Sequence, residues 1–224
     1  MAVNTFQQSS ENGFIAINPM FKKAGIEILQ FALESGSITT LLGKAVQLLK
    51  TALNVSWCCV FELTSDKESF DLKFGTNRLN SLIKNCKLSA DSGCYPGCAL
   101  HIHEPFMVED FATESRFMVP PNFAECGIKS GMSMRLGDSG RPHGVIGVYS
   151  DRYPNFTIED IEFFLAFSRI LTSAIIRIQT VDTLKKSRTD LSHAQRIAGM
   201  GNWEWDLLTG KVYWSDEIFQ IFGI

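Results

Sequence analysis

The sequence predicts an α+β fold in which helices cover one face of a single antiparallel sheet. Residues 20–34 and 38–53 carry apolar side chains at three- and four-residue steps, which is typical of amphipathic helices. Two pairs of strand-favouring runs lie further along the chain, each pair separated by turn residues: 56–63 with 70–74, and 130–136 with 144–150. A last helical pattern begins at residue 158.

The first helix is expected over residues 20–34, with Ser35-Gly36 ending it. Its predicted buried stripe consists of Phe21, Ile28, Leu29 and Leu33. Ser37 is placed to cap the second helix, whose apolar positions are Leu41, Leu42, Ala45, Leu48, Leu49 and Ala52. Residues 1–19 are rich in Ser, Gln and Asn and are expected to be disordered.

The middle of the chain is less regular. Ser65-Asp66 make the first hairpin turn, and residues 80–84 suit a short helix. In residues 87–103 Gly93, Pro96 and Gly97 break any regular pattern. A strand is expected at 105–108, a short helical segment at 111–117, and an irregular connector at 120–128 before the second hairpin.

Thr157 and Asp160 form a pattern similar to a capping box, so a long helix should begin at Ile158 and continue to Gly199. Its predicted core face consists of Ile161, Phe164, Leu165, Leu171, Ile175 and Ile178. Beyond Ile178 only Val181, Leu184 and Leu191 continue the pattern among polar residues. Such a narrow seam suits pairing with a second copy, so a homodimer through the helices is expected.

Residues 202–207 and 211–214 read as two short aromatic strands around a turn at 208–210. Ser215 is then placed to cap a helix that carries Ile218, Phe219 and Phe222.

Three stretches resemble the second half of a GAF domain, a sensory module of signalling proteins: EPFMVEDFATESRF, GIKSGMSMRL and GVIGVYSDRYPNFTIEDIEFF. The segment GNWEWDLLTGKVYWS resembles the opening of a PAS domain. The expected organisation is therefore a disordered segment at 1–19, a GAF domain at 20–178, a signalling linker helix at 179–198 and an incomplete PAS domain at 199–224. A PAS domain needs roughly one hundred residues, so the chain is expected to be the front of a longer protein.

The GAF resemblance implies a ligand pocket on the face of the sheet that the main helices leave uncovered. Its expected lining and mouth are formed by Phe61, Phe74, Asp110, Phe111, Arg116, Phe117, Met132 and Met134. Each of these has a structural alternative. Asp110 and Arg116 suit tying down the segment between them, and the aromatic and methionine side chains are also ordinary core residues.

The cysteines and histidines offer a weaker hypothesis. Cys94, Cys98, His101 and His103 could supply thiolate and imidazole ligands to a metal, but their spacing matches no common zinc pattern. Metal or haem is therefore not the expected cofactor, and no cofactor is assigned. Bilin-binding relatives carry a Cys-His dipeptide, which this sequence lacks.

The composition and charge of the chain argue against several classes of function. The formal net charge is -3 and Lys and Arg form no basic stripe, which argues against nucleic-acid binding. No uncharged apolar run is long enough to span a membrane, and residues 1–12 lack the pattern of a secretory signal. A cytoplasmic protein with reduced cysteines is expected.

No catalytic motif occurs in the sequence. The resemblance implies the sensory input region of a GAF–PAS signalling protein, with a histidine kinase as the first expectation for its output in a two-component system. Three alternatives stay open: a diguanylate cyclase or phosphodiesterase output, a structural dimerisation module that binds nothing, and a Cys/His metal or redox sensor.

Overall fold

The computed structural model describes residues 18–77, 87–153 and 156–223. The chain divides into two compact units, Met1–Ser173 and Ala174–Ile224. The short helix expected at 80–84 lies outside the described residues, and so does nearly all of the segment expected to be disordered.

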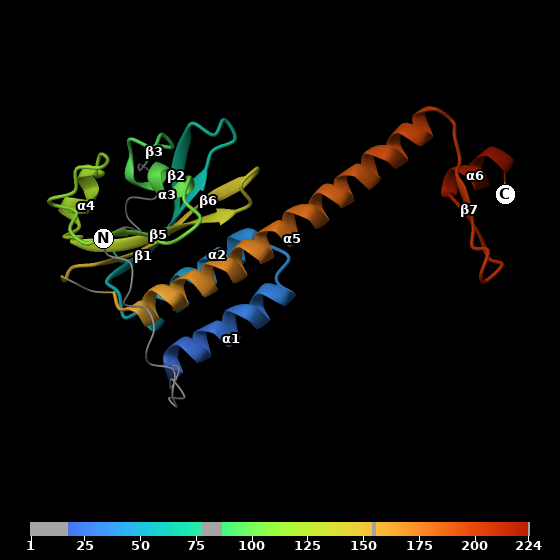
Figure 1. Ribbon diagram of the computed structural model, residues 1–224. Helices are drawn as coiled ribbons and strands as arrows, with labels where there is room; N and C mark the ends of the chain where they lie inside the picture. Colours follow the sequence, from blue (N-terminus) through green and yellow to red (C-terminus); the bar gives the residue numbers. More distant parts are fainter. Residues whose placement is uncertain (1–17, 78–86, 154–155, 224) are drawn as a thin grey trace, which may run out of the picture. The chain divides into compact units, whose positions relative to one another are not determined.

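Six strands form one antiparallel sheet in the order β3-β2-β1-β6-β5-β4 (Figure 1). The strands are β1 Trp57–Leu63, β2 Ser69–Gly75, β3 Lys87–Ser89, β4 Phe106–Val108, β5 Ser130–Gly137 and β6 Pro142–Ser150. Both predicted hairpins occur as neighbouring antiparallel pairs, β1 with β2 and β5 with β6. The predicted α+β class with a single antiparallel sheet in this unit is confirmed.

Three helices lie on one face of this sheet, called here the helical face, and the first of them is the outermost (Figure 1). They are α1 Pro19–Glu34, α2 Ile38–Ala52 and the first part of α5 Ile158–Ile197. The predicted cap of α2 is confirmed, because the Ser37 hydroxyl accepts a hydrogen bond from the Thr40 amide. α2 contacts both β1 and β2.

The buried stripe of α1 differs from the prediction. Leu29 and Leu33 are exposed, whereas Ala24 and Ala32 are buried with Phe21 and Ile28. Both stripes have helical spacing, and α1 packs against α2 through the one that carries the alanines. Small side chains let two helices approach closely, which explains why the larger leucines lie outside.

The start of α5 follows the predicted capping box. The Thr157 amide donates to the Asp160 carboxylate at 2.8 Å, and the Asp160 amide donates back to the Thr157 hydroxyl at 3.2 Å. Phe163 stacks on Phe21 of α1 with ring centroids 4.3 Å apart. The helix ends just before Gly199, which adopts a φ of 63°. None of the helices in the described ranges is long and apolar enough to cross a membrane.

The opposite face of the sheet, called here the inner face, carries two short helices, α3 Tyr95–Leu100 and α4 Pro121–Glu125. α3 contacts β3, β5 and β6. The connector expected to be irregular at 120–128 contains α4. This helix starts at Pro121, and proline is pre-organised for the first helical turn.

The prediction of a short helix at 111–117 is wrong, because this segment contains only a turn, at residues 111–113. Asp110 accepts the Ala112 amide, and Glu114 accepts the amides of Ser115 and Arg116. Side chains thus bind backbone groups that a helix would otherwise have used.

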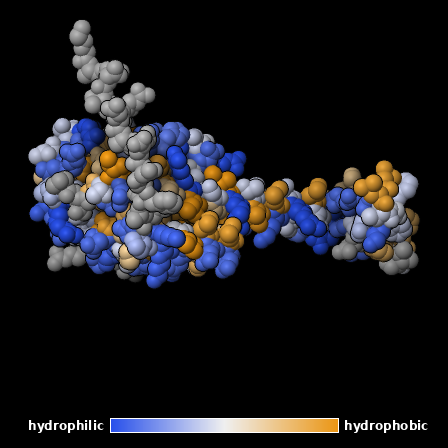
Figure 2. Space-filling model, turned by 60° about the horizontal axis from the view of Figure 1, so that its bottom comes forward, coloured by the Kyte–Doolittle hydropathy of each residue, from blue (hydrophilic) through white to orange (hydrophobic). Residues whose placement is uncertain are grey.

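The unit Ala174–Ile224 ends in a two-stranded ribbon, β7 Trp203–Trp205 with β8 Val212–Trp214, followed by α6 Asp216–Phe222. The two strands and the helix match the predicted pattern. Ser215 stands at the start of α6, but its hydroxyl accepts the Asn202 amide at 3.2 Å rather than capping the helix. The strands' aromatic side chains are exposed, and apolar residues gather on this part of the surface in Figure 2.

Candidate functional site

Tyr95 lies at the centre of an aromatic cluster on the inner face of the sheet. It is the first residue of α3, and its side chain is fully buried. Its ring contacts five others at centroid distances between 5.0 and 6.0 Å: Phe106, Phe111, Phe117, Phe123 and Tyr149. These rings come from the sheet, from α4 and from the segment after β4, so they fill the space between the inner face and its covering loops.

Two tyrosine hydroxyls are satisfied inside this cluster. The Tyr95 hydroxyl lies 2.6 Å from the Ser133 hydroxyl of β5, which lies 3.4 Å from the Tyr149 hydroxyl of β6. Burial raises the pKa of both phenols, so they remain neutral. The network joins α3 to the middle of the sheet, since a buried hydroxyl without a partner would be costly.

The structure brings together three of the predicted ligand-binding residues. Phe61, Phe111 and Phe117 belong to one buried cluster on the inner face, with at most 8% of each side chain exposed. Their rings pack against protein side chains, Phe111 and Phe117 against Tyr95 and Phe61 against Phe70.

Met132, Met134 and Phe74 lie on the helical face instead. Ser133 points to the inner face, and neighbours on a strand point to opposite faces, so Met132 and Met134 face the helices. Phe74 would share the face of Phe70 and Leu72 in a regular strand. The β1–β2 register shifts between Val60 and Phe61, however, and Phe74 pairs with Val60 and approaches Gly43 of α2.

Asp110 is occupied by contacts within the chain. Its carboxylate accepts the Ala112 amide at 2.8 Å and the Tyr153 hydroxyl at 2.9 Å. These hydrogen bonds, the backbone one foremost, lower the pKa of the carboxyl. Asp110 therefore ties the segment after β4 to the segment after β6.

Arg116 is likewise held by its surroundings. Its guanidinium donates to both oxygens of Glu114 and to the Met107 carbonyl at 3.0 Å, and it lies 4.9 Å from the Phe106 ring centre. The hydrogen bond from Arg116 is the main reason why the pKa of Glu114 falls to about 2. The Glu114 side chain is only 7% exposed, so the pair also covers the edge of the aromatic cluster.

The candidate metal ligands are not brought together. Cys98 donates to the Ser92 carbonyl, His101 ends α3, and His103 contacts the Arg135 guanidinium at 2.9 Å. Cys94 is buried at the start of α3. Among the described residues no three His, Cys, Asp or Glu side chains lie close enough to hold a metal ion.

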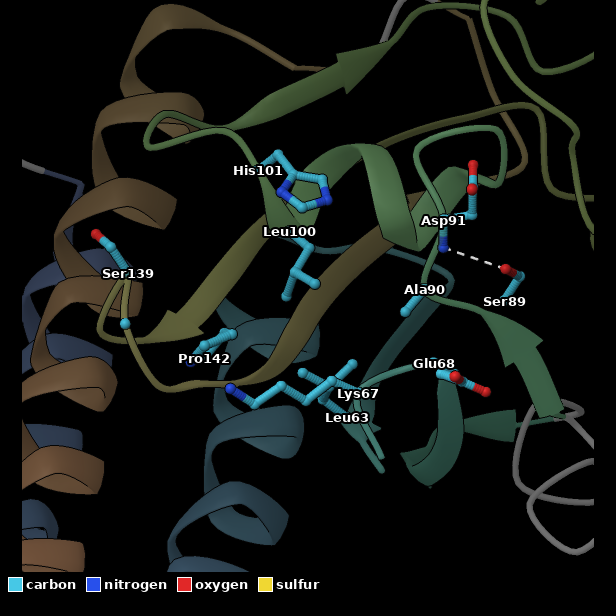
Figure 3. Close-up of a pocket in the computed structure, with 11 residues that line it drawn as sticks. Leu63, Lys67, Glu68, Ser89, Ala90, Asp91, Leu100, His101, Ser139 and Pro142 are labelled. Atoms are coloured by element: carbon cyan, nitrogen blue, oxygen red, sulfur yellow. Dashed lines mark hydrogen bonds between the residues drawn. The ribbon is translucent and has the colours of Figure 1, made fainter. Parts of the chain in front are cut away.

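An open pocket of about 670 Å³ lies at one end of the sheet (Figure 3). Its walls are the β1–β2 turn, the segment after β3, the end of α3 and the β5–β6 turn. The lining consists of Leu63, Lys67, Glu68, Ser89, Ala90, Asp91, Leu100, His101, Ser139, Gly140 and Pro142. Apart from His101, which was a candidate metal ligand, sequence reasoning missed these residues because they come from four separate segments whose spacing matches no motif.

Arg135 holds two of the pocket walls together. It extends from the inner face of β5, and its guanidinium donates to the Leu100 carbonyl and the Ser139 hydroxyl, each at 3.4 Å. The same group contacts His103, which follows α3. The end of α3 and the β5–β6 turn are thus joined through one side chain.

Comparisons with known proteins agree with this architecture. The GAF domain of a phosphoenolpyruvate-protein phosphotransferase from Coxiella burnetii superposes with a TM-score of 0.64 at 15% identity, over 74% of this chain and 99% of that one. Free methionine-R-sulfoxide reductase from Neisseria meningitidis, in complex with its substrate, gives 0.62 at 15% identity, over 76% and 98%. Residues 122 to 287 of a methyl-accepting chemotaxis protein give 0.58 at 17%, over 69% and 98%.

No curated protein sequence matches the chain significantly. The family model described as GAF domain matches residues 35–176, which is more than half of the chain. This stretch runs from the end of α1 into α5 and includes the whole six-stranded sheet. The chain belongs to the GAF domain family.

Proposed function

We propose that this chain is the sensory input region of a cytoplasmic signal-transduction protein, in which a GAF domain is followed by a linker helix and the start of a PAS domain. The observation that carries the proposal is α5, which runs for 40 residues without a break from the GAF domain toward β7. A GAF domain with a helix of this length leaving its last strand suits the relay of a signal along the chain.

Two similar structures support a signalling host. One belongs to a methyl-accepting chemotaxis protein, and another is a domain assigned to a two-component sensor histidine kinase from Sinorhizobium meliloti 1021, with a TM-score of 0.54 at 18% identity over 67% of this chain. A histidine kinase output is therefore proposed first, and a diguanylate cyclase or phosphodiesterase output remains the alternative in the same class.

The later part of α5 suits a parallel homodimer. Val181, Leu184 and Leu191 are 37%, 65% and 59% exposed, and they follow the three- and seven-residue steps of a coiled-coil seam. A lone exposed helix is marginally stable in water, so pairing of two copies would stabilise this stretch. In such a dimer a ligand that favours one arrangement of the GAF loops would bias the rotation of the paired helices.

A helix-phase experiment in the intact signalling protein tests this relay. One residue inserted after Lys186 turns the following helix by about 100°, whereas a seven-residue insertion keeps the seam nearly in phase. We expect the single insertion to change basal output strongly and the seven-residue insertion to restore most of it. Equal output from both variants would overturn the relay.

A second candidate function is a dimerisation and spacer module that binds no ligand. The aromatic cluster around Tyr95 favours it, because the inner face is packed with the chain's own side chains. Native mass spectrometry of the chain purified from cells separates the two. A retained small molecule at one per subunit excludes the spacer function. In the insertion experiment described above, an output that is insensitive to every insertion supports the spacer function.

A further inference from the structure

The end of the β5–β6 hairpin contacts elements on both faces of the sheet. On the inner face, Arg135 of β5 joins the turn to the end of α3 and to His103. Two residues later, the Gly137 amide donates to the Thr172 hydroxyl of α5 at 3.3 Å. Because α5 lies on the helical face (Figure 1), two nearby residues of one strand connect elements that the sheet otherwise separates. All of these residues belong to the compact unit that ends at Ser173.

The conformation of this turn depends on a glycine. The register of the β5–β6 pair shifts between Leu136 and Gly137, and Gly137 adopts a φ of 92°. A Cβ at this position would lie 2.7 Å from the His143 amide nitrogen and 3.0 Å from the Arg141 carbonyl oxygen. Glycine is therefore required both for the positive φ and for the close approach of the returning strand. The amide that binds Thr172 thus belongs to a bulge that any side chain would disturb.

The hydrogen bond to Thr172 constrains α5 in a way that apolar packing does not. Phe164, Phe167 and Leu171 are at most 1% exposed, and hydrophobic burial of this kind has no preferred direction. A hydrogen bond weakens steeply when its geometry changes, so it resists rotation and sliding of the helix. Ser168, one turn earlier, is fully buried, but its hydroxyl has no partner among the described residues. Of the two hydroxyls, the one on Thr172 ties the helix to the turn.

The contacts of Arg135 make the same turn sensitive to the inner face. Its guanidinium binds the Leu100 carbonyl at the end of α3 and the Ser139 hydroxyl in the turn, and it lies 2.9 Å from the His103 imidazole. A displacement of the end of α3 would change these contacts and with them the position of Ser139. Since Ser139 is two residues from Gly137, the change would reach the amide that binds α5.

We propose that the β5–β6 turn is a coupling device that transmits a displacement of the end of α3, on the inner face, to α5, on the helical face. Arg135 makes the contact on the inner face, and the Gly137–Thr172 hydrogen bond makes the contact on the helical face. Its biological meaning rests on the proposed sensory function, because the turn is then the contact through which the GAF domain moves the relay helix. Each contact orders the turn, so the loss of one weakens the other.

A double-mutant cycle on the full chain tests the coupling. Arg135→Met removes the guanidinium and keeps an aliphatic side chain, and Thr172→Val removes the hydroxyl and keeps the side-chain shape. Urea unfolding gives the unfolding equilibrium constant of each variant. We expect Thr172→Val to raise this constant about fivefold in the parent, and by less than half that factor in the Arg135→Met background. Independent distant sites multiply to within about twofold, so factors that agree within about twofold would overturn the proposal.

Two further variants separate coupling from a purely local role of Thr172. Thr172→Ser keeps the hydroxyl, so its factor should be the same in both backgrounds. Thr183→Val makes the valine substitution at an exposed position of α5, where the hydroxyl donates to the Gln179 carbonyl, and its factor should also be the same in both backgrounds. If Thr183→Val depends on Arg135 as strongly as Thr172→Val does, the tie to the turn is not the cause and the proposal fails.

The cycle and the helix-phase experiment can fail independently. If Arg135→Met and Thr172→Val are coupled while the insertions after Lys186 leave the output unchanged, the turn transmits a displacement within the GAF domain and the relay fails. If the insertions behave as expected while the two substitutions act independently, the relay stands and this coupling device is excluded.

Discussion

At the scale of single residues, Tyr95 links the ring cluster to the sheet. Tyr95→Phe removes the hydroxyl that contacts Ser133, and we expect a loss of about 1 kcal/mol in the free energy of unfolding. Tyr95→Ala also removes a fully buried ring, and about 3–5 kcal/mol should be lost. Urea unfolding followed by circular dichroism measures both, with exposed Tyr213→Phe as the neutral control. A Tyr95→Ala variant as stable as the parent would contradict the packed inner face.

The lowered pKa of Glu114 predicts that the free energy of unfolding depends on pH. Its folded pKa is lowered to about 2, chiefly by Arg116, so its stabilising contribution is present above the ordinary carboxyl pKa. The contribution is lost as pH falls toward the folded value. Glu114→Gln should therefore be less stable than the parent by about 1–2 kcal/mol at pH 7, and the difference should shrink by pH 3. Exposed Glu125→Gln is the control, and a difference that stays constant with pH would contradict the pair's role.

The face of the sheet on which each predicted pocket residue lies depends on strand geometry that the sequence shows only in part. The large aromatic side chains Phe61, Phe111 and Phe117 were placed on the inner face from the family resemblance. Alternation places Met132 and Met134 on one face of β5 but does not say which. Phe74 changes face because of a strand irregularity, which leaves no pattern in the sequence.

At the scale of elements, replacing two helical glycines by alanine is expected to change stability in opposite directions. A Cβ on Gly97 of α3 would lie 1.9 Å from the Asp91 carbonyl oxygen, so Gly97→Ala must push α3 away from the segment after β3. We expect a loss of about 2 kcal/mol or more, as for other overpacked sites, together with a weakened pocket wall. Thermal and urea unfolding measure the loss.

Gly25 of α1 supplies the matched control. No atom lies within 4 Å of a Cβ placed there, and the position is helical. Gly25→Ala should stabilise the chain by about 0.5–1 kcal/mol, because alanine loses less backbone entropy on folding. Similar destabilisation by both substitutions would show that the close approach at Gly97 is not the cause.

The elements that could be predicted are those with strong local signals. The Ser37 cap, the Thr157 and Asp160 capping box and the turn-separated strand pairs all specify structure within a few residues. α3 and α4 are each less than two turns long, too short for a helical pattern to show, and long-range packing against the sheet determines them. The candidate pocket has the same origin, since four distant segments meet there only in the folded chain.

At the scale of the whole molecule, the GAF domain has its inner face filled and an open charged pocket at the end of its sheet. The two turns and the α3 end that wall this pocket belong to strands and helices of the same core. A ligand that contacted two of these walls at once would hold them against one another. The core would then favour one arrangement, which is the differential affinity that any ligand-driven signal requires.

The proposed dimer predicts that charges placed in the α5 seam will separate the two copies. Leu184→Lys with Leu191→Lys places four charges in the proposed seam of a dimer. Each buried leucine contributes about 1.5–3 kcal/mol, so dimer dissociation should increase by at least about 100-fold. Thr183→Lys with His193→Lys adds the same number of lysines outside the seam and should leave the dimer intact.

Sedimentation equilibrium of the full chain measures all three proteins under the same conditions. The expected outcome is a dimer for the parent and the Thr183/His193 variant, and a monomer for the Leu184/Leu191 variant. If the parent is monomeric at about 100 μM, the exposed apolar seam has another use and the proposed relay by paired helices fails with it. If both double variants dissociate equally, added charge rather than the seam is responsible.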